Sequence, residues 1–255
     1  MAETILEAVR VRKEFGGLVA LCDLDFGVRR GTVTAVIGPN GAGKTTLINV
    51  MTGVTAPTSG SIALNGSIIS GLKSHEIARL GIARTFQTAQ IFSAMTVLEN
   101  VMVGRHTKTG CGMIASALSL GRMRREERTI CDKGLYYLDV VGLGALAHQP
   151  AASVPIGTQR LLEIGRALAA EPVVLLLDEP AAGLNTQETR ALGKLIGTIR
   201  DMGITVIIVE HDMELVMDIA DEILVLNFGS RLAWGTPEHI QASPEVIEVY
   251  LGKED

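Results

Sequence analysis

The stretch Gly38-Pro39-Asn40-Gly41-Ala42-Gly43-Lys44-Thr45-Thr46 decides the fold of this chain. It fits the pattern G-x-x-x-x-G-K-[ST], in which successive backbone N–H groups of a glycine-rich loop converge on an anion. Residues 32–37 before it read as a buried strand, and residues 44–52 after it read as a helix whose positive end faces the same anion. The complete pattern in this context favours a nucleoside-triphosphate site over a simple glycine-rich turn.

Two carboxylates supply a second part of the predicted site. Asp178 and Glu179 directly follow the apolar segment at residues 173–177, which reads as a buried strand. In the loop, Lys44 is expected to reach the β- and γ-phosphates, and the hydroxyl of Thr45 to ligate Mg²⁺. Asp178 is expected to hold the same Mg²⁺, and Glu179 to orient or deprotonate a water. This pattern predicts hydrolysis of the nucleotide as well as its binding.

Three further side chains are candidates for this site. Gln87 and His211 each follow a predicted strand of the same lobe, where hydrogen-bonding side chains would contact the metal's water and the γ-phosphate. Phe15 stands just before the turn residues Gly16-Gly17. From its position alone, Phe15 either stacks on a nucleotide base or belongs to the core at the end of a strand.

The composition excludes several classes of protein. The 255 residues include 23 basic and 28 acidic side chains, a net charge of −5, whereas nucleic-acid-binding domains usually carry a basic excess. Although 47% of the residues are hydrophobic, the longest apolar runs fall short of the about 18 to 20 residues of a membrane span and fit central parallel strands. The N-terminal residues do not have the pattern of a secretory signal. The three cysteines, Cys22, Cys111 and Cys131, lack metal-ligand spacing and are interpreted as free thiols of a reducing cytoplasm.

Periodicity predicts an α/β lobe interrupted by a helical lobe. Strands are expected as an antiparallel pair within 4–30, a hairpin at 61–69 about Asn65-Gly66, and segments 82–86, 173–177, 204–210, 222–228 and 231–234. Helices are expected at 74–80, from the Thr96–Glu99 capping box through Val103, at 188–202 and 212–220, and after Thr236-Pro237. Residues 90–165 are interpreted as the helical lobe and 235–255 as a C-terminal extension. The run at 122–128 mixes charge signs, which favours a solvated helix face.

Five motifs, taken in order, resemble those of an ATP-binding-cassette ATPase. They are Gly38 to Thr46, Arg84-Thr85-Phe86-Gln87, the signature-like Val154-Pro155-Ile156-Gly157-Thr158-Gln159-Arg160, Leu177-Asp178-Glu179-Pro180 and Glu210-His211-Asp212. The resemblance extends over nearly the whole chain. It implies an α/β P-loop NTPase fold, with a RecA-like core, an N-terminal antiparallel β subdomain and an inserted α-helical subdomain. It also implies a single nucleotide-binding domain over residues 4–255.

The same resemblance assigns roles to the candidate residues, with ATP and Mg²⁺ as cofactors. It implies that Phe15 stacks on adenine, that Gln87 is the Q-loop glutamine at the metal, that Glu179 is the catalytic base and that His211 is the switch histidine. It further implies that residues 181–185 form the D-loop, with Asn185 where aspartate is usual.

The signature segment, by this resemblance, contacts the ATP of a partner subunit through residues that include Gly157 and Thr158. Serine is replaced there by Pro155, which has neither a hydroxyl nor an N–H. The donors that remain are the N–H of Gly157 and the positive end of the helix expected at 158–169. We therefore expect the two ATP sites of a subunit pair to be unequal.

One branch of this family is more similar still. Residues 179–185, 210–213, 235–238 and 249–252 resemble the ATPases of branched-chain or hydrophobic amino acid importers, and the extra material at 107–128 resembles the larger of their two ATPase subunits. The resemblance implies a second ATPase subunit in a homo- or heterodimer, two integral membrane permease subunits and a periplasmic or extracellular solute-binding protein. It also implies a peripheral position at the cytoplasmic face of the inner membrane, without nucleic acid.

Other functions remain as alternatives. Transporters of urea and short amides share this branch, so these solutes stay open. Soluble cassette ATPases that act on ribosomes or DNA usually have two cassettes, a long coiled coil or a basic arm, and none of these occurs in the sequence. A regulatory module without turnover is disfavoured by the intact Lys44, Asp178, Glu179 and His211. The apolar side chains that would seat a membrane subunit, or else pack inside the helical lobe, are Phe92, Met95, Val97 and Met102.

Overall fold

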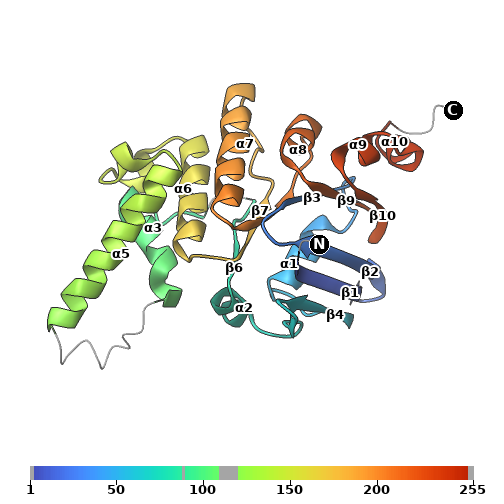
Figure 1. Ribbon diagram of the computed structural model, residues 1–255, viewed down its shortest axis with the longest axis horizontal. Helices are drawn as coiled ribbons and strands as arrows, with labels where there is room; N and C mark the ends of the chain where they lie inside the picture. The colour runs from blue at the N-terminus through green and yellow to red at the C-terminus, as the bar shows by residue number, and fades with distance from the viewer. Residues whose placement is uncertain (1–2, 88–89, 109–119, 252–255) are drawn as a thin grey trace. The chain divides into compact units, whose positions relative to one another are not determined.

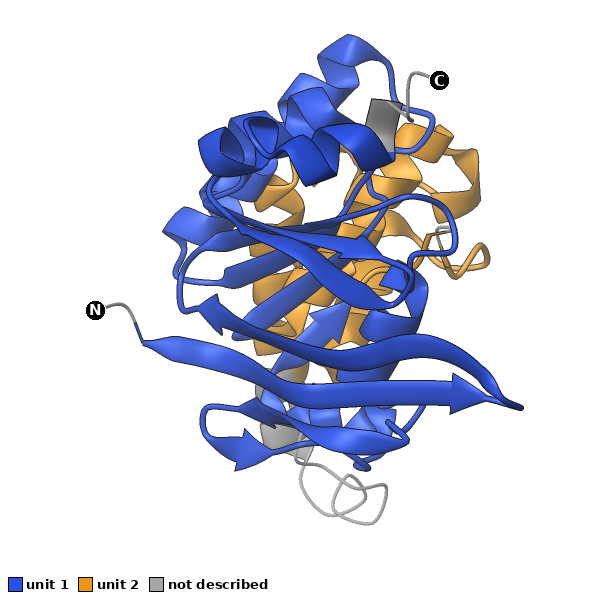
Figure 2. Cartoon of the chain, turned by 90° about the vertical axis from the view of Figure 1, so that its right-hand side faces the viewer, with its two compact units in different colours: residues 1–84, 173–255 blue, residues 85–172 orange. Residues whose placement is uncertain are grey.

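The chain is described by a computed structural model that covers residues 3–87, 90–108 and 120–251 (Figure 1). It divides into two compact units, one of residues 1–84 with 173–255 and the other of residues 85–172 (Figure 2). The expected helical lobe at 90–165 falls within the range of the second unit. Cys111 and Gly252 lie outside the described residues.

The first unit contains two β-sheets. One is a four-stranded sheet in the order β2-β1-β4-β5 whose paired strands are all antiparallel: β1 (Thr4–Phe15), β2 (Leu18–Arg29), β4 (Ser59–Leu64) and β5 (Ser67–Ile68). The other is a six-stranded sheet in the order β10-β9-β3-β8-β7-β6, made of β3 (Val33–Ile37), β6 (Ile82–Arg84), β7 (Val174–Asp178), β8 (Thr205–Val209), β9 (Glu222–Asn227) and β10 (Ser230–Gly235). Its strands pair in parallel except for β10, which runs antiparallel to β9.

The helices of the first unit lie on both sides of the six-stranded sheet. They are α1 (Lys44–Met51), α2 (Ser74–Leu80), α7 (Thr186–Asp201), α8 (Met213–Ile219), α9 (Pro237–Gln241) and α10 (Pro244–Leu251). Helix α1 lies between the two sheets, while α7, α8 and α9 lie on the opposite side of the six-stranded sheet (Figure 1). Every residue of β3, β7 and β8 is buried, because these central strands are covered on both faces.

The apolar core of this unit joins its two sheets through α1. The core cluster includes Leu6 of β1, Leu24 of β2, Leu47 of α1 and Leu176 of β7, each at most 1% exposed. Full burial of one such side chain contributes on the order of 2 kcal/mol to folding. The loop that precedes α1 is therefore held between a rigid strand and a helix anchored in this core.

Several predicted elements are confirmed with shifted ends. The hairpin about Asn65-Gly66 forms, and both residues have positive φ, 50° and 75°, as a two-residue hairpin turn with Asn-Gly requires. The strand expected at 82–86 ends at Arg84. The helix expected from 188 begins at Thr186, because the Asn185 side chain accepts hydrogen bonds from the N–H groups of Gln187 and Glu188 and caps it.

The chain leaves the first unit after β6 and returns to it at β7. These two strands are neighbours in the sheet, with Ile82 opposite Val174 and Arg84 opposite Leu176. The N–H of Val173 donates to the carbonyl of Gly81, which extends the pairing beyond the strands. The second unit is therefore inserted between adjacent strands.

The second unit is built from helices. They are α3 (Val97–Gly104), η1 (Arg105–Lys108), α5 (Leu120–Val140), η2 (Gly144–Leu146), η3 (Ala151–Ser153) and α6 (Ile156–Ala169). Helices α3, α5 and α6 pack against one another. The predicted capping box is confirmed, since the Thr96 hydroxyl accepts from the N–H of Glu99 and the Glu99 carboxylate accepts from the N–H of Thr96.

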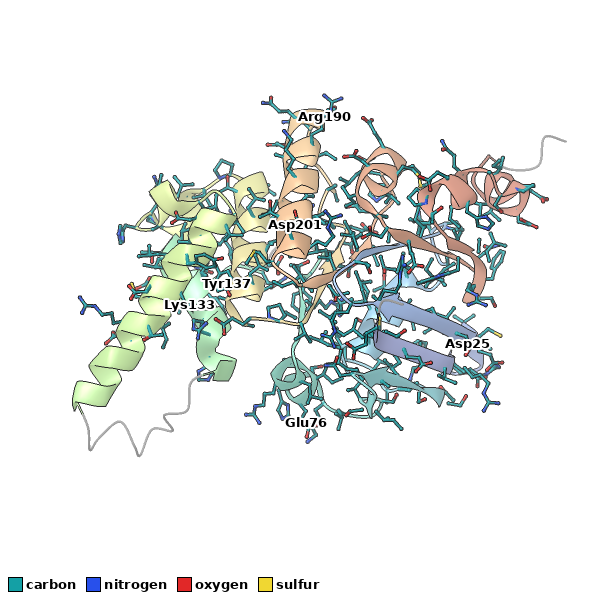
Figure 3. The ribbon with its side chains drawn as sticks, viewed as in Figure 1. Asp25, Glu76, Lys133, Tyr137, Arg190 and Asp201 are labelled. Atoms are coloured by element: carbon teal, nitrogen blue, oxygen red, sulfur yellow. The ribbon has the colours of Figure 1, made fainter. Side chains whose placement is uncertain are left out.

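Helix α5 carries polar groups along its length. Lys133 and Tyr137 lie one turn apart on it (Figure 3), and the Lys133 ammonium pairs with Glu171 at 2.9 Å. The charged run at 122–128 is part of this helix; Glu127 and Arg128 are exposed, and the other side chains of the run lie outside the description. Cys22 and Cys131 are free thiols. Among the described residues, no helix has the length and apolar character needed to cross a membrane.

Candidate nucleotide-binding site

The glycine-rich loop joins β3 to α1 as predicted. Gly43 is the N-cap of α1 with φ 103°, and no side chain caps the first turn of this helix. A Cβ at Gly43 would lie 2.6 Å from the carbonyl oxygen of Ala20, so only glycine fits both the conformation and the space. The first N–H groups of α1 and the positive end of the helix dipole are thus presented to the loop. This arrangement suits a phosphate group.

Lys44 is held inside this loop. Its ammonium donates to the carbonyl of Gly38 at 2.6 Å and to that of Pro39 at 3.0 Å. Partial burial lowers the pKa of Lys44, while the carboxylates of Glu179 and Asp178 act in the opposite direction. The three charged groups therefore lie near one another, and a partly desolvated cation stands where a polyphosphate would be bound.

Asp178 is the last residue of β7 and is 5% exposed. Burial raises the pKa of its carboxyl group, and the Arg84 guanidinium opposes that rise. Arg84 Nη2 lies 3.2 Å from Asp178 Oδ2, and its Nη1 donates to Asn49 Oδ1 at 2.7 Å and to the Thr52 hydroxyl at 3.4 Å. Arg84 on β6 thus connects β7 to α1 beneath the loop. The carboxylate oxygens of Asp178 are of the ligand type that Mg²⁺ prefers. Thr45, whose hydroxyl is the other expected ligand on α1, is exposed in the first turn of that helix.

Glu179 and His211 follow neighbouring strands of the same sheet. Glu179 has φ 48°, the left-handed conformation that non-glycine residues rarely adopt, and its N–H donates to the carbonyl of Val209 at 2.9 Å. His211 is exposed, two residues beyond the end of β8. Strained backbone at a residue expected to act chemically is typical of functional sites.

Phe15 is not a core residue. Its side chain is 48% exposed at the end of β1, and the Lys13 ammonium lies 4.7 Å from the centre of its ring. The core alternative for Phe15 is therefore wrong, and stacking on a base stays a prediction. The positions of β1, α1 and β7 within this unit can be seen in Figure 1.

The remaining predicted site residues belong to the second unit. Gln87 follows Phe86, whose N–H donates to the buried carboxylate of Glu163 at 3.3 Å. Gly157 and Thr158 lie in the first turn of α6, which begins at Ile156, two residues earlier than expected, with Pro155 as its N-cap. Their roles toward the nucleotide stay predictions.

Two side chains of α6, Glu163 and Arg166, contact the residues on either side of Gln87. Arg166 Nη2 pairs with Glu163 at 3.3 Å, its Nη1 donates to the carbonyl of Gln90, and its guanidinium lies 5.5 Å from the centre of the Phe92 ring. Burial raises the pKa of Glu163, and Arg166 and the N–H of Phe86 act in the opposite direction. A buried charged pair on α6 therefore contacts Phe86 and Gln90, which lie on either side of Gln87 in the chain.

Sequence reasoning gave no individual role to three charged residues: Arg84 and Glu210, which it quoted only within motifs, and Glu163, which it did not name. Each is a charged side chain within or directly after an apolar segment. That position indicates burial, and a charged side chain is rarely buried unless it is paired. Glu210 is 0% exposed and its carboxylate accepts the N–H of Ala181 at 2.7 Å.

A glycine-rich loop between a parallel strand and a helix, with carboxylates at the end of a neighbouring strand, defines a P-loop nucleotide-binding protein. Comparison with known families refines this class. The family described as "ABC transporter" matches residues 21–182. The family described as "Branched-chain amino acid ATP-binding cassette transporter" matches residues 231–255.

Curated relatives and solved structures agree with these matches. The high-affinity branched-chain amino acid transport ATP-binding protein BraF of Pseudomonas aeruginosa is 44% identical over 99% of this chain and 100% of its own length. The corresponding LivG protein of Escherichia coli is 41% identical with the same coverage. A crystal structure of a nucleotide-free ATP-binding cassette from an ABC transporter is 32% identical, with a TM-score of 0.85 over 98% of this chain and 100% of the other. The chain belongs to the ABC transporter family, in the branch of the branched-chain amino acid transport ATP-binding proteins.

Proposed function

We propose that this chain hydrolyses ATP, and that hydrolysis drives the uptake of branched-chain or other hydrophobic amino acids through membrane subunits. The observation that carries the proposal is the position of Glu179, a carboxylate directly after β7 that acts on the pKa of Lys44 in the phosphate loop. The names of BraF and LivG support the choice of solute.

Binding of ATP rests on the loop and on Lys44. The N–H groups at the start of α1 would donate hydrogen bonds to the phosphate oxygens, and the Lys44 ammonium would exchange the carbonyls of Gly38 and Pro39 for phosphate oxygens. Phe15 would stack on the adenine ring. Mg²⁺, held by Thr45, Asp178 and Gln87, would neutralise charge on the phosphate oxygens.

Hydrolysis rests on Glu179 and His211. The Glu179 carboxylate would accept a proton from a water as the water oxygen bonds to the γ-phosphorus and the bond to the β,γ-bridging oxygen breaks. The products are ADP and inorganic phosphate. The His211 imidazole would hydrogen-bond to an oxygen of the γ-phosphate, over whose oxygens the charge is spread as the bond breaks.

The substitution Glu179→Gln tests this assignment. An amide cannot accept the proton, so we expect turnover to fall by about 10² to 10⁴ while ATP binding is kept. Phosphate release would be measured on the assembled transporter, with Lys44→Ala as the variant that loses binding. Near-normal turnover of the Glu179→Gln variant would show that another group is the base.

We further propose that the partners are a second ATPase subunit, two membrane permease subunits and a solute-binding protein, and that the chain acts at the cytoplasmic face of the inner membrane. The observation that supports a membrane partner is an apolar groove of about 640 Å³ on the second unit. Its lining includes Met95, Met102, Val103 and Ile130, with Glu99 and His106 as polar groups.

The four side chains that were expected either to seat a membrane subunit or to pack inside the helical lobe differ in position. Met95 and Met102 line the groove, whereas Val97 is 0% exposed and belongs to the interior of the unit. Phe92 is 46% exposed but lies beside Arg166 and does not line the groove. Met side chains suit such a surface because they adapt to the shape of a partner.

The substitution Met102→Glu tests the groove. A charge there should reduce co-purification of integral membrane proteins from detergent by about tenfold or more. The matched control is Ile68→Glu, which places the same charge at a residue 67% exposed on β5 of the first unit. Equal recovery of membrane proteins with both variants would remove the groove from the proposal.

The pair of ATPase subunits would form head to tail, with the start of α6 of each subunit at the ATP of the other. Pro155 caps α6 without a side-chain hydrogen bond. Pro155→Ser would restore a hydroxyl donor, and we expect a higher ATPase rate or nucleotide affinity in the assembled transporter. Unchanged values of both would show that the signature proline does not weaken the site.

A further inference from the structure

Glu210 is a buried carboxylate to which neither the motifs nor the mechanism above gives a role. It follows β8 directly, and its side chain is 0% exposed. Oε1 accepts the N–H of Ala181 at 2.7 Å, while Oε2 accepts the N–H of His211 at 3.0 Å and that of Asp212 at 3.5 Å. One side chain thus holds the backbone of two separate loops.

The first of these loops contains Glu179. The turn is fixed at its start by the hydrogen bond from the Glu179 N–H to the carbonyl of Val209, the residue just before Glu210, and it closes with a bond from Ala182 N–H to the carbonyl of Glu179. The left-handed φ of Glu179 is a strained conformation for a residue other than glycine. The bond from Ala181 to Glu210 lies two residues after the strained position and opposes relaxation of the turn.

The second loop contains His211. The Oε2 atom that accepts the His211 N–H lies 3.8 Å from the imidazole Nδ1 of the same residue. The backbone of His211 is therefore fixed by the carboxylate that also fixes the Glu179 turn.

We propose that Glu210 is a positioning residue for hydrolysis, whose buried carboxylate locks the turn of Glu179 to the loop of His211. It acts through these two residues and does not contact the nucleotide. The proposal rests on the proposed function, in which Glu179 is the base and His211 contacts the γ-phosphate.

The carboxylate form is required by the donors around it. Both oxygens face backbone N–H groups, and a carboxylate offers acceptors at both positions. A glutamine offers one oxygen and one NH₂ group, so one loop would face a donor where it now has an acceptor. Burial raises the pKa of Glu210, whereas the N–H groups of Ala181, His211 and Asp212 favour its charged form.

The test is Glu210→Gln in the full chain within the assembled transporter. We expect the maximal rate of ATP hydrolysis to fall about tenfold or more, because hydrogen bonds to a charged acceptor are stronger than those to a neutral one. The affinity for a fluorescent ATP analogue should change less than about twofold, since the loop from Gly38 to Thr46 is not among the partners of Glu210.

The matched control is Glu76→Gln on α2 (Figure 3). The Glu76 carboxylate also accepts a backbone N–H, that of Lys73 at 2.8 Å, but it caps a helix away from both loops. We expect this variant to hydrolyse ATP at the wild-type rate. Equal rates for the Glu210→Gln variant and the wild type would overturn the inference about Glu210. Absence of hydrolysis in the wild-type complex would instead overturn the proposed function.

A combined variant separates positioning from a general loss of structure. In a background that carries both Glu179→Gln and His211→Ala, Glu210→Gln should not reduce the residual rate further, because the two side chains through which Glu210 acts are already absent. A further tenfold loss would mean that Glu210 acts elsewhere, and the proposal would fail.

A measurement on the wild type does not depend on how the variants fold. The amide protons of Ala181 and His211 should exchange with solvent about 10² times more slowly than in an unstructured peptide, as expected for hydrogen bonds to a buried carboxylate. Exchange at the unstructured rate would show that Glu210 does not hold these loops.

Discussion

Arg84 is the side chain whose removal tests most directly how the Asp178 carboxylate is kept charged. In Arg84→Met the cation 3.2 Å from Asp178 is replaced by an apolar group of similar length. The side chains of the pair are 12% and 6% exposed, so the remaining carboxylate stays buried. Breaking a buried pair by removing one partner costs about 3 to 5 kcal/mol. The Lys44 ammonium also favours the charged form of Asp178, so we expect a loss near the lower end, about 3 kcal/mol.

This loss of stability should increase as the pH rises. Burial already raises the pKa of Asp178 in the folded protein, and without Arg84 the pKa rises further above its value in the unfolded chain, about 3.9. The folded variant therefore binds more protons than the unfolded chain, and its stability falls as pH rises through this window. The difference from the wild type should be small near pH 4 and complete near pH 8.

The assay is urea unfolding of both proteins at several pH values. The double variant Arg84→Met with Asp178→Asn removes the uncompensated charge and should recover most of the lost stability at pH 8. If the Arg84→Met variant lost the same free energy at every pH, or if Asp178→Asn restored nothing, the buried charge would not be the cause. Arg84 would then act through its other partners, which include Asn49 of α1 and Thr52, the C-cap residue of that helix.

Three further predictions concern the loop, a helix cap and a buried phenol. Gly43→Ala should abolish binding of an ATP analogue and cost about 2 kcal/mol or more in urea unfolding, because its Cβ would lie 2.6 Å from the Ala20 carbonyl oxygen. The control is Gly31→Ala, at φ 69° with open space, which should keep binding. Binding by both variants would refute the clash. Asn185→Ala should cost about 1 kcal/mol by loss of the α7 cap, measured by urea unfolding; no change would refute the cap. Burial raises the pKa of Tyr137 to about 12, so Tyr137→Phe should remove the last step of a spectrophotometric tyrosine titration; an unchanged last step would assign it to another tyrosine.

The fold was largely predictable because its signals are local. The loop at 38–46, the turn at Asn65-Gly66 and the capping box at Thr96 each specify a backbone geometry within a few residues. The apolar strands at 33–37, 174–178 and 205–209 were visible as continuous runs because both faces of each are buried.

What the sequence left open, or gave no role, depended on contacts between distant segments. Val97 was left open between a docking surface and the interior of the helical lobe, and it is fully buried. Phe15 was left open between core and site because exposure at a strand end depends on the other strands. Arg84 and Glu210 are partnered by residues 94 and 29 positions away, which a local pattern cannot join.

Insertion of the second unit between β6 and β7 has a consequence for protein engineering. Because Arg84 stands opposite Leu176, the chain ends at 84 and 173 are about three residues apart along adjacent strands, or about 10 Å. A short linker of a few glycines and serines spans that distance. The helical insert can therefore be exchanged as a block between homologues, and such chimaeras would test whether it contributes to partner choice separately from the chemistry of the sheet.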